Sequence, residues 1–362
     1  MRNKKIAFFG YKNSFDFDKI GGTDAFIRRV SNSLKKDYEI FLIHYDMKEN
    51  SSIFISNNIS QLYFSKFNDA LSFIKKNNII NTICIYLKPV DRLKLFQFHN
   101  LNNKLIFHTL ISVYNENIFK RWVLFLESTM TYNGNIYCIS NRIFQSIKSI
   151  SKKPVLLLPP VDDSFFKVNK LKTKQRKKVR VAYMGRLDYG KGADLALKFF
   201  LNSKLDPKKY EFYMYTYPWE NDSFSMRLHN KLSNQNEINY VQSKLYDDPK
   251  RVTSFLKKII DDTDIFYLPY RYMYSTIDTP LVPLEILARN KKYITTNING
   301  ISHLAFHDDL LVNKNQLSDY ELISDRIIKV LKKSYEIDSF VDKLNFKTSN
   351  ISKLLIESIK NG

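Results

Sequence analysis

The sequence predicts an α/β protein with two successive domains, each built on a doubly wound parallel sheet. Three observations support this fold class. The chain has 362 residues, which is more than one hydrophobic core usually spans. Short apolar segments alternate with longer amphipathic segments in both halves. Six of only nine glycines lie at the junction between the first predicted strand and the first predicted helix of one half or the other.

The first domain is expected to span residues 1–165. Its predicted strands are 4–10, 38–44, 80–86, 104–108, 135–140 and 154–159. Residues 24–36 show helical periodicity, because Phe26, Ile27 and Val30 share one face and basic residues occupy the other. Repetition of strand, helix and strand predicts a parallel sheet with helices on both faces.

A polar and strongly basic run follows the first domain. Residues 166–178 are expected to form a solvated linker, and residues 179–345 the second domain. The strands predicted for the second domain are 179–185, 210–216, 238–242, 264–270 and 292–297. Residues 346–362 predict a C-terminal helix, capped by Ser349 and packed back on the first domain.

Composition limits the classes of function. The net charge of +21 is spread over both halves, and no zinc finger, RNP-like segment or basic heptad helix is present, so no nucleic-acid partner is expected. No apolar run reaches the ~20 residues of a membrane span, and the first residues do not form a signal peptide, which predicts a cytoplasmic protein. Cys84 and Cys138 lie in predicted strands and are expected to be buried free thiols.

A glycine-rich loop follows the first strand of the second domain, in the sequence VAYMGRLDYGKG. Gly185, Gly190 and Gly192 allow a tight turn and close approach of backbone amides to a ligand. Arg186 and Lys191 add two cations at the carboxyl end of a strand, where open α/β sheets bind ligands. The loop therefore predicts a phosphate site. A plain strand-to-helix turn with solvated cations is the alternative.

A second glycine loop, IGGTDAFIRRV, follows the first strand of the first domain. Gly21 and Gly22 precede Thr23 or Asp24, either of which is expected to cap the next helix. Neither loop has the spacing GxxxxGK[ST] or GxGxxG, which disfavours kinases and dehydrogenases.

The third informative segment is DIFYLPYRYMYSTIDTPLVPLEIL. Pro283 is expected to open a helix that carries Glu285 in its first turn. A carboxylate in that position can also serve only as a partner of the helix dipole.

Taken in order, GRLDYGKG, the strand ending in Leu-Pro, PLVPLE and TTNINGISHL resemble the carboxyl-terminal half of the family 4 (group 1) glycosyltransferases. IGGTDAFIRRV and the segments CISNRIFQSIK and VLLLPPVDDSFF resemble the amino-terminal half, so the likeness runs from about residue 6 to residue 305. It implies the GT-B fold, in which two Rossmann-like domains face a cleft. It also implies a retaining hexosyltransferase of the bacterial surface-polysaccharide type, with a nucleotide-sugar on the second domain and a glycan or lipid-linked acceptor on the first.

The resemblance also assigns roles to residues. Arg186 and Lys191 would grip the donor pyrophosphate, and Glu285 would accept hydrogen bonds from the ribose hydroxyls. Amides at Leu281 and Val282 would contact the phosphate. The remaining implied contacts to the donor are Gly185, the opposing Gly21 and Gly22, and His108, which would reach the sugar from the end of strand 104–108. A histidine satisfied by backbone is an equally open interpretation of His108.

One departure from the family pattern concerns the donor sugar. The family has an acidic residue eight positions before Glu285, where this chain has Ile277 flanked by Asp278. Either Asp278 takes that role with a shifted backbone, or the contact to the sugar is missing. The donor sugar and its base therefore stay open.

No metal site or cofactor is expected. Asp16 with Asp18, and Asp261 with its acidic neighbours, are interpreted as solvated acids. In NIFKRWVLFLE, Lys120, Arg121 and Trp122 adjoin apolar residues, which suits either an anionic membrane surface or a core helix. The rival functions are another GT-B enzyme, such as an epimerase or a phosphorylase, and a non-catalytic polyanion-binding protein.

Overall fold

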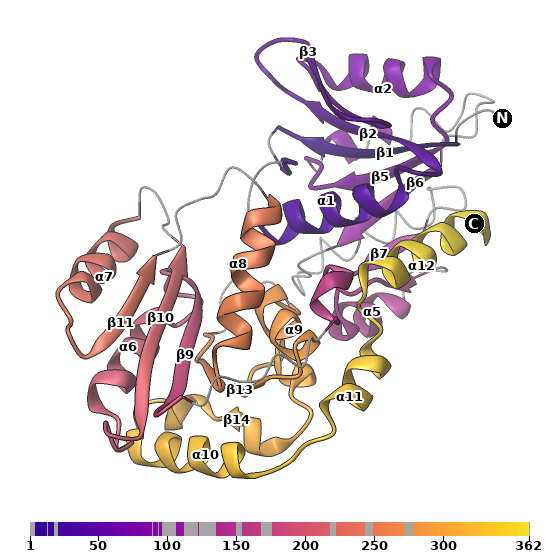
Figure 1. The fold of residues 1–362 in the computed structure, drawn as a ribbon. Coiled ribbons are helices and arrows are strands. Elements are labelled where there is room, and N and C mark those ends of the chain that lie inside the picture. The colour runs from indigo at the N-terminus through magenta and orange to yellow at the C-terminus, as the bar shows by residue number, and fades with distance from the viewer. Residues whose placement is uncertain are drawn as a thin grey trace. The chain divides into compact units, whose positions relative to one another are not determined.

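The structure is a computed structural model. It describes residues 4–12, 14–17, 21–88, 90–92, 94–95, 106–111, 122, 135–149, 154–167, 176–217, 222–242, 249–271 and 278–361. The chain divides into two compact units, each with its own sheet (Figure 1). Unit 1 comprises residues 1–160 and 346–362, and unit 2 comprises residues 161–345. The expected linker 166–178 lies largely outside the described residues.

Unit 1 contains an eight-stranded sheet of order β3-β4-β2-β1-β5-β6-β7-β8. Its strands are β1 Lys4–Tyr11, β2 Tyr38–Tyr45, β3 Ser51–Ser56, β4 Ile59–Phe64, β5 Asn81–Ile85, β6 Ile106–Ile111, β7 Ile136–Cys138 and β8 Pro154–Leu156. All neighbours pair in parallel except β3 and β4. Because the chain first builds outward from β1 to β2 and then returns to β5, the order reverses between β1 and β5.

The β3–β4 hairpin departs from the expected strand and helix alternation. Its two-residue loop ends at Asn58, which adopts a left-handed conformation with φ of 67°. β3 is an antiparallel edge strand with Ile53 and Phe54 exposed, so its side chains show no buried apolar pattern. Sequence periodicity predicts a buried strand from such a pattern, and for this reason the hairpin was not predicted.

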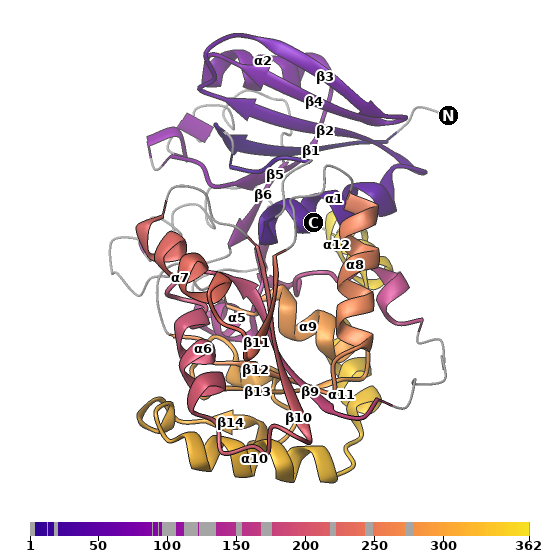
Figure 2. The ribbon, with the colours of Figure 1, turned by 60° about the vertical axis from the view of Figure 1, so that its left-hand side comes forward.

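The helices of unit 1 that the structure describes from end to end are α1 Gly22–Leu34, α2 Phe67–Lys76, α5 Asn141–Lys148 and α12 Thr348–Asn361. α12 packs beside α1, as Figures 1 and 2 show. The Asn135 amide donates to the Ser358 carbonyl at 2.9 Å, and the hydroxyls of Tyr137 and Ser358 lie 3.0 Å apart. Ser349 lies inside α12, so its expected role as a cap is wrong. Cys84 and Cys138 are buried thiols that belong to no disulfide, as predicted.

Unit 2 contains a six-stranded parallel sheet of order β11-β10-β9-β12-β13-β14. Its strands are β9 Val179–Arg186, β10 Tyr210–Tyr217, β11 Ile238–Gln242, β12 Ile265–Leu268, β13 Lys292–Thr296 and β14 Leu311–Val312. Its helices are α6 Ala193–Asn202, α7 Ser223–Ser233, α8 Pro249–Asp261, α9 Leu281–Ala288, α10 Tyr320–Lys332 and α11 Ile337–Leu344. Short 3₁₀ helices cover Asp163–Phe165, Ser302–Leu304, Asp308–Leu310 and Lys314–Gln316. The predicted α/β class with parallel sheets is confirmed.

Helices cover both faces of the unit 2 sheet. α6 and α7 lie on one face and α8 and α9 on the other (Figure 2). The apolar side chains of α6, α7 and α10 form one buried cluster with those of β9, β10 and β12. As in unit 1, the strand order reverses at the first strand, here between β9 and β12. The carboxyl ends of β9 and β12 are therefore the place where an open sheet of this kind binds ligands.

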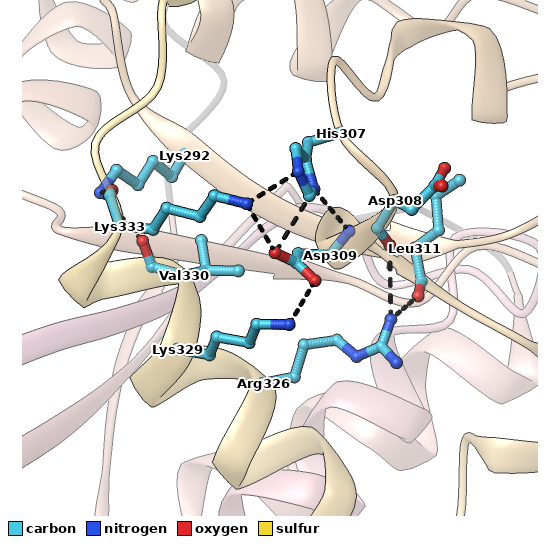
Figure 3. A network of polar contacts seen from close by, with 9 residues as sticks. All are labelled: Lys292, His307, Asp308, Asp309, Leu311, Arg326, Lys329, Val330 and Lys333. Carbon is cyan, nitrogen blue, oxygen red and sulfur yellow. Dashed lines mark hydrogen bonds and ion pairs between the residues drawn. The ribbon is translucent and has the colours of Figure 1, made fainter.

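A polar network holds α10 at the other end of the unit 2 sheet (Figure 3). The Asp309 carboxylate accepts from Lys329 at 2.7 Å and from Lys333 at 3.3 Å, and these lysines hold the pKa of Asp309 below its usual value. The Lys292 ammonium donates to the carbonyls of Val330 and Lys333 at 2.9 and 2.7 Å. A cation at the C-terminus of α10 satisfies its last carbonyls and opposes its dipole.

Candidate functional site

The loop between β9 and α6 is organised by one carboxylate, Asp188. Its Oδ1 accepts a hydrogen bond from the Lys191 amide at 2.8 Å, and its Oδ2 pairs with the Arg186 guanidinium at 3.0 Å. The hydroxyl of the buried Tyr183 donates to the Arg186 carbonyl at 2.8 Å. Arg186 and Lys191, both predicted from sequence, are thus held on one ordered turn at the carboxyl end of β9.

Gly192 is the position in this loop where only glycine fits. Its φ is 68°, and a Cβ atom would lie 1.9 Å from the Pro269 carbonyl oxygen. We expect Gly192→Ala to lower the free energy of unfolding by at least about 1–3 kcal/mol. The left-handed conformation strains the alanine, and its Cβ atom also displaces Pro269, the residue directly after β12. Urea titration measures this effect. A Gly192→Ala protein as stable as the native one would contradict the close approach.

Arg271 fastens the loop to the chain segment that follows β12. Its two Nη atoms donate to the Asp194 carboxylate at 2.6 and 2.8 Å, and Nη1 also donates to the Tyr189 carbonyl at 2.8 Å. Its backbone amide donates to the Gly190 carbonyl at 2.9 Å, and its guanidinium lies 4.0 Å from the centre of the Tyr189 ring. Sequence reasoning missed Arg271. The available signal was an arginine shortly after β12 and an aspartate in the first turn of the helix that follows the neighbouring strand β9.

The ammonium of Lys191 lies over the ring of Tyr270. It is 4.9 Å from the centre of the Tyr270 ring, and Tyr270 is 2% exposed. Burial lowers the pKa of Lys191 to about 8; Asp188 opposes this shift and the charge of Arg186 adds to it. Burial likewise raises the pKa of Tyr270, and Asp188 and Glu285 raise it further. The buried phenol therefore lies within electrostatic range of both the glycine loop and α9.

Glu285 lies in the second turn of α9 and is 4% exposed. The helix begins at Leu281, two residues before Pro283, so the prediction that Pro283 opens the helix is wrong. Proline is tolerated there because the first four amides of a helix have no partner inside it. The amides of Leu281 and Val282 are the first two of α9, and Pro280 provides no side-chain cap.

Asp278 stands just before α9 and is 6% exposed. The next residue, Thr279, has φ of 58°; its amide donates to the Gly300 carbonyl at 2.8 Å and its hydroxyl lies 3.1 Å from Nε2 of His303. Burial lowers the pKa of His303, and the charge of Asp278 raises it. His303 was not predicted from sequence. Ile277 lies outside the described residues.

The structure of unit 2 thus brings the sequence-predicted residues of that unit to the carboxyl edge of its sheet. They are Gly185, Arg186, Lys191, Asp278, Leu281, Val282 and Glu285. They reach this edge from three places along the chain: the end of β9 with the loop after it, the segment before α9, and α9 itself. Cationic side chains and the free amides of a helix start form an arrangement suited to a diphosphate.

The predicted residues of unit 1 are described on that unit alone. Gly21 is the N-cap of α1 and Gly22 its first residue, so capping by Thr23 or Asp24 is wrong. Asp24 instead accepts from the Asp16 amide at 2.7 Å, and a Cβ at Gly21 would lie 2.2 Å from the Asp24 carboxylate. His108 pairs with Ile83 within β6, which continues to Ile111 and does not end at the histidine. Its side chain is not among the described parts of the chain.

Two further expectations concern metals and membranes. Across the described ranges, His, Cys, Asp and Glu side chains do not gather in threes as metal ligands would. In the same part of the chain, every helix is too short or too polar to traverse a bilayer. Of the segment NIFKRWVLFLE only Trp122 is described, and it is 56% exposed; Lys120 and Arg121 lie outside the described residues.

No protein-family model matches the chain, and a search of curated proteins finds no significant relative. Solved structures do match along its whole length. A glycosyltransferase from Rickettsia africae superimposes with a TM-score of 0.69 at 15% identity, covering 100% of both chains. HepE from Anabaena, in complex with UDP, has a TM-score of 0.68 at 10% identity and covers 99% of this chain and 100% of its own. The chain has the GT-B fold.

A third GT-B structure also matches. It is a UDP-forming α,α-trehalose-phosphate synthase from Burkholderia xenovorans in complex with glucose-6-phosphate, with a TM-score of 0.62 at 9% identity over 98% of this chain and 99% of the other. At these identities the likeness concerns the fold. In this fold, unit 1 and unit 2 are the two Rossmann-like domains, and the site described above belongs to the second of them.

Proposed function

We propose that this protein is a glycosyltransferase that moves a sugar from a nucleotide-sugar donor on unit 2 to an acceptor on unit 1. The observation that carries the proposal is the pair Arg186 and Lys191, held on one turn by Asp188 at the carboxyl edge of the unit 2 sheet. The matching HepE structure holds UDP, and the matching synthase is named UDP-forming, which supports a uridine nucleotide.

The residue types suit the chemistry of this transfer. Breaking the bond between the sugar and the diphosphate builds negative charge on the leaving group, and fixed cations aimed there lower the barrier. Arg186 and Lys191 supply this charge, and the first amides of α9, at Leu281 and Val282, supply donors along the helix dipole. No carboxylate nucleophile is needed. We propose that the transfer retains the anomeric configuration, as in the family 4 (group 1) glycosyltransferases.

The remaining site residues then position the donor. The buried Glu285 accepts hydrogen bonds from the ribose hydroxyls, while Gly185 lets the phosphates approach the backbone. Asp278 takes the place of the acidic residue that contacts the sugar. The left-handed backbone of the next residue, Thr279, provides the shift that this role requires. We assign Gly21, Gly22 and His108 of unit 1 to the donor phosphate and sugar.

We further propose that the acceptor is a glycan or a lipid-linked sugar, used in bacterial surface polysaccharide such as lipopolysaccharide O-antigen or capsule. The net charge of +21 supports peripheral contact with the anionic inner face of the cytoplasmic membrane. Transfer is independent of metals and cofactors, since the cations of the chain itself offset the charge of the diphosphate.

Binding of nucleoside diphosphates tests this function. In calorimetry with UDP and GDP, we expect the protein to prefer one base, whereas a general polyanion binder would not distinguish them. The pKa of Lys191 is about 8, and the diphosphate binds the charged form of this side chain. The affinity for the preferred nucleotide should therefore be highest below about pH 8 and fall by up to about tenfold per pH unit above it. Equal affinity for both nucleotides, or no binding, would overturn the proposal.

A further inference from the structure

Residues with a left-handed backbone conformation cluster at the carboxyl edge of the unit 1 sheet. Among the described residues other than glycine and asparagine, positive φ occurs only at Lys12, Asp46, Tyr86 and Thr279. Thr279 belongs to the site on unit 2. The other three each follow directly on a strand, namely β1, β2 and β5, with φ of 46°, 64° and 51°. Such strain concentrates at functional sites, and β1 and β5 flank the point where the strand order reverses.

Two lysines at this edge share one carboxylate. The ammonium of Lys88 lies 2.9 Å from Oδ2 of Asp46, and that of Lys12 lies 3.9 Å from the same oxygen. The two ammonium groups also lie 4.2 and 5.2 Å from the centre of the Tyr11 ring. Lys88 lowers the pKa of Asp46, and Asp46 raises that of Lys88. The group carries a net positive charge and faces solvent, since its three charged side chains are 41–57% exposed.

Buried groups hold the backbones of both lysines. The Lys12 amide donates to the Tyr45 carbonyl at 2.8 Å, and its carbonyl accepts from Nδ1 of the fully buried His44 at 2.7 Å. The amide of Lys88 donates to the Tyr45 hydroxyl at 3.2 Å. That hydroxyl also bonds to Asp91, and burial raises the pKa of Tyr45. The two ammonium groups therefore extend from a rigid base, which lowers the entropy lost when they hold a ligand.

We propose that the acceptor of this enzyme carries a phosphoryl group, and that Lys12 and Lys88 bind it at the carboxyl ends of β1 and β5. This inference rests on the proposed function. A dianionic phosphoryl group replaces Asp46 as the shared partner of the two lysines. Ammonium groups bind phosphate oxygens as compact point charges, and two of them offset the double charge of a phosphoryl group. The phosphoryl group belongs either to a soluble sugar phosphate or to a lipid-linked acceptor.

Amine footprinting on the full chain tests the site without relying on activity. Acetylation of individual lysines is followed by mass spectrometry in glucose 6-phosphate, in glucose, and with phosphatidylcholine vesicles with or without a polyprenyl phosphate, all at equal ionic strength. We expect one of the two phosphate-bearing probes to slow acetylation of Lys12 and Lys88 about tenfold. Glucose and plain vesicles should not protect them. The probe that protects identifies the source, and protection by neither overturns the proposal.

Matched variants separate specific binding from net charge. Lys12→Gln with Lys88→Gln, and Lys36→Gln with Lys76→Gln, each remove two positive charges from unit 1. Lys36 and Lys76 are exposed and lie at the ends of α1 and α2, away from the carboxyl edge. The first pair should raise the dissociation constant of the protecting probe at least about tenfold, and the second should leave it unchanged. Equal effects of the two pairs overturn the proposal.

Asp46→Asn tests the exchange of partners from the opposite direction. Asparagine tolerates the left-handed conformation, so the backbone is preserved. Freed from the carboxylate, Lys12 and Lys88 should bind the probe about threefold more tightly; weaker binding contradicts the exchange. UDP affinity is measured for every variant. Intact UDP binding without phosphate protection overturns this inference alone, whereas loss of UDP binding by the native chain overturns the proposed function.

Discussion

Lys191→Met is expected to lower sugar transfer by a factor of about 10²–10³, the cost of removing one fixed group that stabilises the leaving charge. Methionine keeps the length and apolar stem of the side chain but cannot donate to a diphosphate. Because the effect grows as charge develops, kcat should fall more than the affinity for the donor. Turnover is measured as nucleoside diphosphate released when acceptor is added.

Lys191→Met lowers activity, but it should keep or raise the stability of the folded chain. Burial holds the pKa of Lys191 at about 8, so between that pH and the ordinary value of 10.5 the folded chain binds fewer protons than the unfolded chain. Charged Lys191 therefore works against folding below about pH 8, and Lys191→Met without nucleotide should melt at or above the native temperature. Lys198→Met, on the exposed face of α6, is the matched control. Equal activity losses in both variants would contradict the role of Lys191.

Arg289→Met is expected to lower the free energy of unfolding of unit 2 by about 3 kcal/mol, the lower end of the range for the loss of one partner of a buried ion pair, because the Asp261 side chain stays 32% exposed. Arg289 is 5% exposed. It donates to the Asp261 carboxylate at 2.8 Å and to the carbonyls of Phe165 and Lys167 at 2.9 and 2.8 Å. It thus binds the first residues of unit 2 to α8 and α9, and methionine would leave these acceptors without a donor.

Hydrogen exchange at the amides of β12 and β13 measures this change for unit 2 alone, because a protein of two units need not unfold in one step. Arg227→Met provides the control, since Arg227 is exposed on α7. Protection in Arg289→Met equal to that of the control variant would show that the network contributes little.

Local patterns predict the strands well where side chains are buried. The ranges 38–44, 179–185 and 292–297 each match a strand of the structure to within one residue. The β3–β4 hairpin was missed because an exposed edge strand lacks an apolar signature. Helix starts were shifted at α1 and α9, where Gly21 and Pro280 rather than a polar side chain precede the first turn. Caps of this kind leave no side-chain signal for prediction.

The candidate site shows the same division. Glycine spacing and the two cations of the β9–α6 loop were visible in the sequence, because they lie within eight consecutive residues. Arg271 and Asp194 are 77 residues apart, and Arg289 and Phe165 are 124 apart. Which of the 57 basic residues meets which carboxylate depends on strand order, and no local pattern encodes it. The same holds for Lys12, Lys88 and Asp46, which meet because β1 pairs with both β2 and β5.

By itself, the sequence determined that this chain forms two α/β units with a glycine turn after the first strand of each, because periodic burial and backbone freedom are local properties. Only the tertiary structure decided where charges are paired and where they face solvent. The reason is physical: the energy of a charge depends on its distance to other charges and on the surrounding medium, and both are set when distant strands come together.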